Sequence, residues 1–346
     1  MWRRIVSWVS GPLLAAFFLW LCLRGVSLHD LGTQVRGAHP LWLAFSALTV
    51  VVHLILRSWR WRTLLRSVRA KIPYRELLSA TSIGYMASLL PGRVGEVLRP
   101  ALLARRADLP FPPALATVGV ERAVLDLLAV LAFGAAALVL PAGVSGLSAG
   151  ADPLLLARLR VAGGAVLAGA LVALVLTMLL ARHRESVGAW LETRRQTMGR
   201  LPRLVTGWLA SLLPGLATFS TMRGALRLAW ETLLVWLVIG VGIQAGIHST
   251  GVAVPPGAFL LMLPILAAGI GIPTPGGTGT YHLAMMLGLS KLFGVDEAAA
   301  LGAGVVVHAV TWLPVLAMGG GFIVAGGLGR RDGGRGPADA SGAVAP

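Results

Sequence analysis

Long apolar runs constrain the fold of this chain more than any other feature. Six of them come close to the roughly 17–25 residues that a helix needs to cross a bilayer, at residues 5–23, 41–56, 113–140, 161–180, 228–247 and 298–326. Only 13% of the 346 residues are charged, whereas soluble domains carry about 25%, so much of the apolar surface must face lipid. The sequence therefore predicts an all-α, polytopic transmembrane helix bundle.

Two further apolar stretches, 77–109 and 258–293, are interrupted by Pro and Gly. If the first stretch crossed the membrane once, the basic stretch 182–203 would lie outside, although basic loops normally face the cytoplasm. We therefore predict that 77–109 is a re-entrant hairpin that enters from the cytoplasm. Counting onward, 258–293 is a second hairpin that enters from outside. Both termini would then be cytoplasmic, with the protein in the cytoplasmic cell membrane.

The two broken stretches form an inverted repeat. Each carries a P-G-x-x-G motif midway along its length, Pro91-Gly92-Arg93-Val94-Gly95 in the first and Pro275-Gly276-Gly277-Thr278-Gly279 in the second. Paired segments interrupted by Gly and Pro in oppositely oriented halves indicate a transporter site near the midplane. Glycine turns there would let the backbone approach a lipid head group, and we assign Gly92, Gly95, Gly276, Gly277 and Gly279 to that site.

Charged residues lie inside the apolar part of the chain. Arg93, Glu96 and Arg99 are three residues apart and share one helix face, and two guanidiniums beside a glycine turn can clamp a phosphate. We therefore predict that they bind the head group.

A second group of charges interrupts the apolar run 113–140. Glu121, Arg122 and Asp126 are either functional or a structural ion-pair network that holds the hairpin to its neighbour. Arg57 and Arg60, interleaved with Trp residues, have the pattern of an interfacial belt.

Several classes of function are excluded or disfavoured. The sequence has no metal-ligand cluster, no P-loop and no Ser/His/Asp array with recognisable spacing, so we expect no metal, no cofactor and no enzymatic activity. Nucleic-acid binding is not expected, because the basic residues flank helices one by one. Cys22 is the single cysteine, which rules out an intrachain disulfide.

Four motifs, in this order, resemble the transmembrane region of the lysylphosphatidylglycerol synthases, a flippase-like family. They are Arg60-Trp61-Arg62-x-x-Leu65, Leu90-Pro91-Gly92-Arg93-x-Gly95-Glu96-x-x-Arg99, Glu121-Arg122-x-x-x-Asp126 and Pro273-x-Pro275-Gly276-Gly277-x-Gly279. The resemblance implies a lipid translocation module at 1–328. A Gly/Ala/Pro-rich, disordered cytoplasmic tail would follow at 329–346, so we do not expect lysyl transfer by this chain.

This sequence differs from the family at two positions. Members commonly carry Glu where His282 stands, at the second glycine turn, and often Arg in the final helix, where His308 stands. If that Glu and Arg pair with each other, two histidines can replace them as neutral partners. We assign His282 to the head-group site and His308 to the intramembrane charge network.

The function expected from these patterns is translocation of an anionic lipid, phospholipid or polyprenyl-phosphate-linked, across the membrane. An alternative is a non-transporting lipid-binding subunit that holds a membrane glycosyltransferase or a lipid- or hopanoid-modifying enzyme. A membrane enzyme acting on an isoprenoid or hopanoid lipid is disfavoured, because the sequence offers no catalytic array.

Overall fold

The computed structural model describes residues 36–90, 94–140, 153–195, 213–272 and 274–332, together with a few single residues elsewhere. Within these ranges the chain is an all-α bundle, as predicted, with five helical segments long and apolar enough to span a membrane. The predicted helix at 5–23 lies outside the described residues. So do residues 333–346 of the predicted tail, whereas the last helix continues to Asp332.

The five long segments match the predicted spans. Helix α3 covers Pro40–Leu65, α9 covers Pro153–Arg182, α12 covers Met222–Ser249 and α15 covers Glu297–Asp332. The remaining span has three parts, α6 (Phe111–Val120), a π-helical turn η1 (Glu121–Asp126) and α7 (Leu127–Val139). The three-part segment begins and ends within two residues of its apolar run. By contrast, α9 begins eight residues and α12 six residues before their runs, and α3 continues past its run through several arginines.

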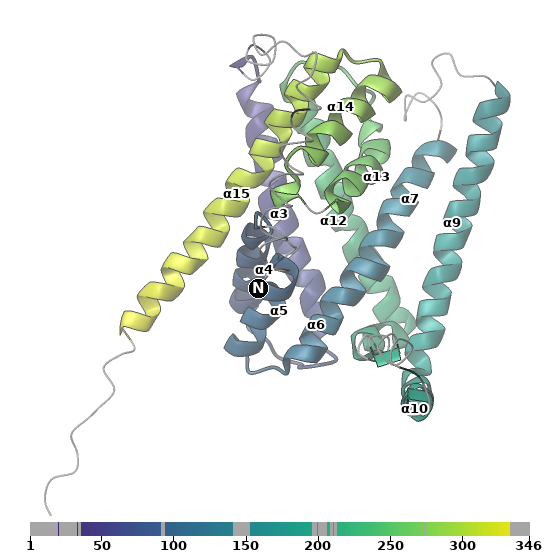
Figure 1. Cartoon of the computed structure of the whole chain (residues 1–346), viewed down its shortest axis with the longest axis vertical. Helices are drawn as coiled ribbons and strands as arrows, with labels where there is room; N and C mark the ends of the chain where they lie inside the picture. Colours follow the sequence, from purple (N-terminus) through teal and green to yellow (C-terminus); the bar gives the residue numbers. More distant parts are fainter. Residues whose placement is uncertain are drawn as a thin grey trace, which may run out of the picture.

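The two broken stretches are re-entrant hairpins. The first consists of α4 (Tyr74–Ala87) and α5 (Val94–Arg106), and the second of α13 (Ala258–Gly271) and α14 (Thr280–Phe293) joined through the short turn η3 (Pro275–Gly277). A helix of this length rises only about 20 Å, too short for a hydrocarbon core of about 30 Å. The first hairpin lies in the lower half of the molecule and the second in the upper half, so they enter from opposite ends (Figure 1).

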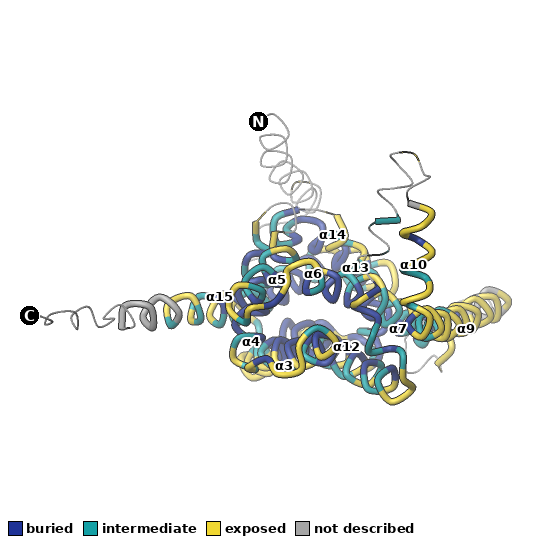
Figure 2. Tube along the Cα trace, turned by 90° about the horizontal axis from the view of Figure 1, so that it is seen from below, coloured by how far each residue is buried: buried dark blue, intermediate teal, exposed yellow. Residues whose placement is uncertain are grey.

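The centre of the bundle is built on close helix contacts. A side chain at Gly242 of α12 would overlap Thr49 of α3, and one at Gly246 would lie 2.7 Å from Val307 of α15. Small residues at such crossings let helix backbones approach closely in a membrane. Buried residues therefore gather in the middle of the bundle, whereas α9 lies at the edge, where it packs against α7 and the short turn Leu213–Ser220 (Figure 2).

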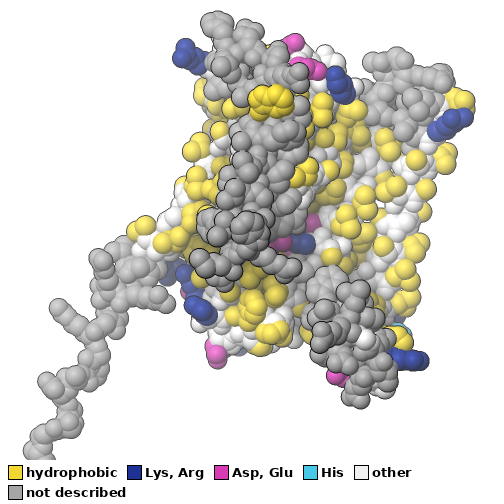
Figure 3. All heavy atoms as spheres, viewed as in Figure 1, with side chains coloured by type: hydrophobic (Ala, Val, Ile, Leu, Met, Phe, Trp, Pro, Cys, Tyr) yellow, Lys and Arg dark blue, Asp and Glu magenta, His cyan; other side chains and the backbone are white. Residues whose placement is uncertain are grey.

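The outer surface has the polarity of a membrane protein. Hydrophobic side chains cover much of the described part of the visible face, and charged side chains gather mainly at its upper and lower ends (Figure 3). At the lower end, the 3₁₀ turn η2 (Leu213–Ser220) packs against α6, and α10 (Arg184–Arg195) packs against η2. A small group of acidic and basic atoms is also visible at mid-height, where charge is costly and usually functional.

Candidate functional site

Helix α3 contributes two buried arginines to the site. Arg57 and Arg60 are 3% and 0% exposed, so the interpretation of these two residues as part of an interfacial belt is wrong. They are three residues apart and therefore lie on the same face of the helix. This face is buried in the bundle. Buried guanidiniums need counter-charges, and the π-helical turn η1 supplies them.

Glu121 and Asp126 of η1 bind both of these arginines. Arg57 Nη1 lies 3.1 Å from Glu121 Oε1 and 3.0 Å from Asp126 Oδ2. Arg60 Nη2 lies 3.0 Å from Glu121 Oε1 and 2.7 Å from Asp126 Oδ1. In a regular α-helix, residues five apart point about 140° away from each other. A π-helical turn hydrogen-bonds from i to i+5 and so brings the two carboxylates to the same face.

Helix α12 contributes neutral donors and acceptors to the same cluster. Trp236 Nε1 donates to Asp126 Oδ1 at 3.1 Å, and Arg60 Nη1 donates to Thr232 Oγ1 at 3.2 Å. Neither residue of α12 could be singled out from the sequence. Their contacts satisfy lone pairs and protons that ion pairing alone leaves unpaired.

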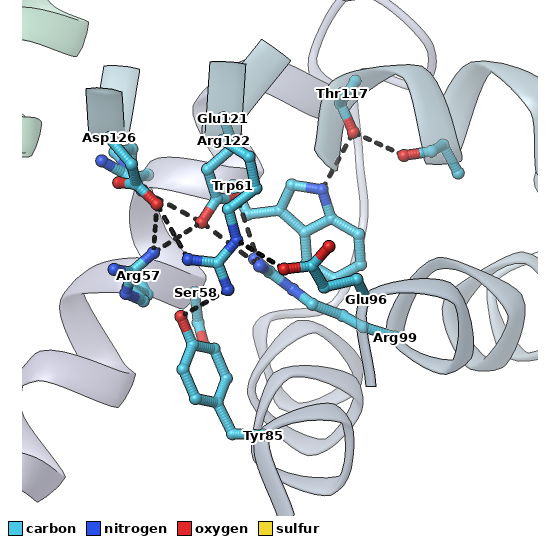
Figure 4. Close-up of polar contacts among 12 residues, drawn as sticks. Arg57, Ser58, Trp61, Tyr85, Glu96, Arg99, Thr117, Glu121, Arg122 and Asp126 are labelled. Carbon is cyan, nitrogen blue, oxygen red and sulfur yellow. Dashed lines mark hydrogen bonds and ion pairs between the residues drawn. The ribbon is translucent and has the colours of Figure 1, made fainter. Parts of the chain in front are cut away.

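Arg99 of the first hairpin joins the cluster from the opposite side. Its Nη1 lies 3.1 Å from Glu121 Oε2, and its guanidinium carbon lies 4.0 Å from the centre of the Trp61 ring, within cation–π range. Trp61 is held in turn by a hydrogen bond from its Nε1 to Thr117 Oγ1 at 2.9 Å (Figure 4). The hairpin is thereby tied to both α3 and α6.

Arg122 and Glu96 form the more open side of the cluster. Arg122 Nη1 lies 3.0 Å from Asp126 Oδ2, and its Nε lies 3.4 Å from Glu96 Oε1. These two side chains are 36% and 32% exposed, in contrast to the buried arginines. Arg122 also donates to the Tyr85 hydroxyl at 3.4 Å. Arg57, Arg60, Arg99 and Arg122 together face three carboxylates, which leaves a net charge of one positive unit among these described residues.

A small pocket opens beside this less buried side. Its cavity volume of about 10 Å³ is about enough for one water molecule. It is lined by Gly84, Tyr85, Ser88, Gly95, Glu96, Arg99, Val118 and Arg122. Predicted head-group residues Gly95, Glu96 and Arg99 therefore lie together at one pocket, with Arg122 of the predicted charge network. Gly92 and Arg93 lie outside the described residues.

The second glycine turn lies at the tip of the other hairpin and meets the first. Gly276, Gly277 and Gly279 have φ angles of 60°, 74° and 84°, a backbone region that glycine adopts without steric cost. The amide of Gly276 donates to the carbonyl of Ser88 at 3.3 Å. Since Ser88 also lines the pocket, the two hairpins meet beside it.

The two predicted histidines are in contact at this junction. The rings of His282 and His308 meet edge to face, with 4.7 Å between their centres. Their hydrogen bonds run to other groups, since His282 Nδ1 accepts from the Gly279 amide at 3.2 Å and His308 Nε2 accepts from Trp312 Nε1 at 2.8 Å. His308 Nε2 also lies 3.0 Å from the carbonyl oxygen of Gly276. The histidines thus join the second hairpin to α15.

The described residues contain no group of three or more His, Cys, Asp or Glu side chains that could hold a metal ion. The spacing of Arg57 and Arg60 is the signal that could have revealed their burial in the site. Together with Trp61, the two arginines lie on one face of a helix. An interfacial belt would distribute its charges around the helix.

Comparison with known proteins identifies the family. The chain aligns with Glycosyltransferase AglD of Haloferax volcanii at 29% identity over 335 residues, which are 89% of this chain and 52% of that relative. The chain thus spans about half the length of this curated relative. The family model described as the lysylphosphatidylglycerol synthase TM region matches residues 8–319. This chain belongs to the lysylphosphatidylglycerol synthase transmembrane-region family.

Proposed function

We propose that this chain translocates an anionic lipid between the leaflets of the cytoplasmic membrane and catalyses no covalent chemistry itself. The observation that carries the proposal is the junction of the two hairpins, where the amide of Gly276 binds the carbonyl of Ser88. Oppositely oriented, broken hairpins that meet inside the bilayer are typical of transporters with alternating access. Broken backbone at that depth requires a polar, protein-lined environment.

The charge of the buried cluster favours an anionic substrate. A net positive group inside a membrane protein is costly, and it is retained where a substrate or ion supplies the missing counter-charge. The orientation we propose places the basic lower end toward the cytoplasm, because positive loops face that side. At this end the segment that joins α3 to α4 carries Arg69, and α10 begins with Arg184.

A second candidate function is a non-transporting, lipid-binding subunit for a membrane-bound glycosyltransferase or another lipid-modifying enzyme. It is favoured by the relative named as a glycosyltransferase, of which this chain matches 52%. In this case the bundle would bind a lipid-linked substrate and present it to a separate catalytic domain. The junction of the hairpins would then be a fixed binding site rather than a gate.

Purified protein in liposomes separates the two candidates. Vesicles carrying fluorescent phosphatidylglycerol are exposed to an impermeant quencher, and the rate at which inner-leaflet label becomes accessible is compared with that of protein-free vesicles. Translocation by the chain alone supports the first function. Lipid binding without translocation supports the second.

Two glycines of the second hairpin provide a matched pair of variants for this assay. Gly276 has a φ of 60°, and an added Cβ would lie 2.8 Å from the Leu89 side chain, so Gly276→Ala should disturb the junction and slow translocation. Gly271 has open space around it and should tolerate alanine at the wild-type rate. Equal rates for the two variants would argue against a role of the junction in translocation.

A further inference from the structure

Arg99, which lines the pocket beside the first hairpin, uses only part of its guanidinium group. This side chain is 3% exposed, and its Nε and Nη2 have no hydrogen-bond partner among the described residues. Only Nη1 is used, in the contact with Glu121. Buried donors without partners are destabilising, so a free edge of this kind is expected where a ligand completes the hydrogen bonding.

The free edge has the geometry of an oxyanion receptor. Nε–H and Nη2–H point the same way and can bind two oxygens of one phosphate or carboxylate in parallel. The stack on Trp61 and the contact with Glu121 hold the guanidinium in place, so the fork is fixed before a ligand arrives. Arg122 lines the same pocket and adds a second positive charge that is accessible from outside.

The pocket as it stands is too small for a phosphate, and the side chain of Glu96 explains why. Its carboxylate lies 3.4 Å from Arg122 Nε and lines the pocket, at the first turn of α5 (Figure 4). It is about a third exposed, so it lies on the side of the pocket from which a ligand arrives. A carboxylate in this position neutralises Arg122 in the way an incoming phosphate would.

We propose that Arg99 and Arg122 form the seat of the phosphate group of a lipid, and that Glu96 occupies this seat as an internal competitor until the lipid arrives. This inference rests on the proposed function and deepens it by naming the recognised group and the residue that opposes its binding. The role of Glu96 therefore differs from the one predicted from the sequence. Its carboxylate does not bind the head group but is displaced by it. The same chemistry would accept free inorganic phosphate if the lipid tail made no contribution.

The decisive variant is Glu96→Gln, which removes the competing charge and keeps the shape. Binding of phosphatidic acid to the purified full chain in detergent should tighten about two- to fivefold, as expected for the loss of one partly exposed charge interaction. A gain in affinity cannot result from misfolding. Glu76→Gln is the matched control, because Glu76 lies on the same hairpin, pairs with Arg106 at 3.5 Å and is equally exposed, yet does not line the pocket. It should leave the affinity unchanged.

A second variant tests the fork itself. Arg99→Lys keeps the positive charge beside Glu121 but presents no bidentate edge, so phosphatidic acid should bind about tenfold more weakly. Its melting temperature is measured in parallel. If this variant does not fold, the result with Glu96→Gln decides alone.

Four ligands give the assay its specificity. Phosphatidic acid and phosphatidylglycerol should bind and compete with each other, whereas oleate should not displace them. Equal binding of oleate would overturn the assignment of phosphate, and displacement by millimolar inorganic phosphate would identify free phosphate rather than lipid as the ligand. An affinity unchanged or weakened by Glu96→Gln would overturn the competitor role.

This binding assay involves no translocation, so the inference and the proposed function can fail separately. Phosphate-selective binding without translocation in liposomes would contradict the proposed function only. Translocation without phosphate selectivity would contradict the inference only.

Discussion

Removing the charge of Glu121 should destabilise the protein more than any other single isosteric change in the cluster. Glu121 is fully buried, and its carboxylate lies 3.1 Å from Arg57, 3.0 Å from Arg60 and 3.1 Å from Arg99. In Glu121→Gln, Asp126 remains as the buried carboxylate that contacts Arg57 and Arg60, whereas Arg99 loses the carboxylate that it contacts. The amide group of the new side chain also presents hydrogens to at least one guanidinium.

The size of this effect follows from the burial of the group. Breaking a buried ion pair by removing one partner costs about 3–5 kcal/mol. At 2–4 °C per kcal/mol, the melting temperature should fall by roughly 6–20 °C. The assay is the temperature at which purified protein in detergent loses its monodisperse peak on size-exclusion chromatography after heating.

The ion pair of Glu76 with Arg106, which is partly exposed, serves as a comparison for the buried contacts of Glu121. Glu76→Gln removes the contact with Arg106, in which both side chains are about one third exposed, 33% and 32%. Solvent screening reduces such a pair to about 0.2–1 kcal/mol, or a shift of at most about 4 °C. If the melting temperatures of the two variants fell by the same small amount, the reasoning about the buried cluster would be refuted.

Three other predictions concern the rest of the fold. For the topology, single cysteines are introduced at Gly251 and at Ser67 in a background without the native cysteine. The cysteine at Gly251 should react with an impermeant thiol reagent in intact cells, whereas the one at Ser67 should not. Labelling at Ser67 would contradict the orientation we propose. For the histidine pair, translocation should fall on acidification, when one imidazole gains a charge beside its neighbour, and His282→Glu together with His308→Arg should remove that sensitivity while either change alone impairs the protein. For the first hairpin, Gly95→Ala should lower the melting temperature, because the added methyl group would overlap a carbonyl oxygen of α4.

Much of the fold could be predicted because the bilayer imposes simple rules. Apolar length defined the spans of α9, α12 and α15, and the distribution of basic residues required that the two broken stretches turn back. The second hairpin begins and ends at the predicted residues, 258 and 293. The P-G-x-x-G motif predicted the tips, and the hydrogen bond between Gly276 and Ser88 shows that the tips meet.

The composition of the site could be predicted only in part. The sequence indicated Glu121, Arg122 and Asp126 as an intramembrane charge group, but α-helical spacing brings only Arg122 and Asp126 to the same face. The π-helical turn was not predictable from that spacing, and it is what places Glu121 and Asp126 on one face. Without it, no partner was evident for Arg57 and Arg60.

The position of Arg99 shows a second limit. Spacing placed Arg99 correctly on a face with Glu96, but spacing cannot tell which atoms of a guanidinium are already used. The structure shows Nη1 bound to Glu121 and the other edge free. Long-range packing of α5 against α3 and α6 decides this, and a single sequence contains no direct record of such contacts.

The central claim, that the chain moves lipid by relative motion of its hairpins, can be tested in one preparation. A side chain at Gly319 of α15 would place its Cβ 2.8 Å from Cβ of Met86 on the first hairpin, so cysteines at these two positions need only a small adjustment to form a disulfide. Proteoliposomes of this variant, without the native cysteine, are assayed for translocation of labelled phosphatidylglycerol in the oxidised state and again after reduction. We expect the oxidised protein to be at least about tenfold slower than the reduced protein, because the cross-link ties the hairpin to the last helix. Equal rates in the two states, or no translocation in either, would contradict the account.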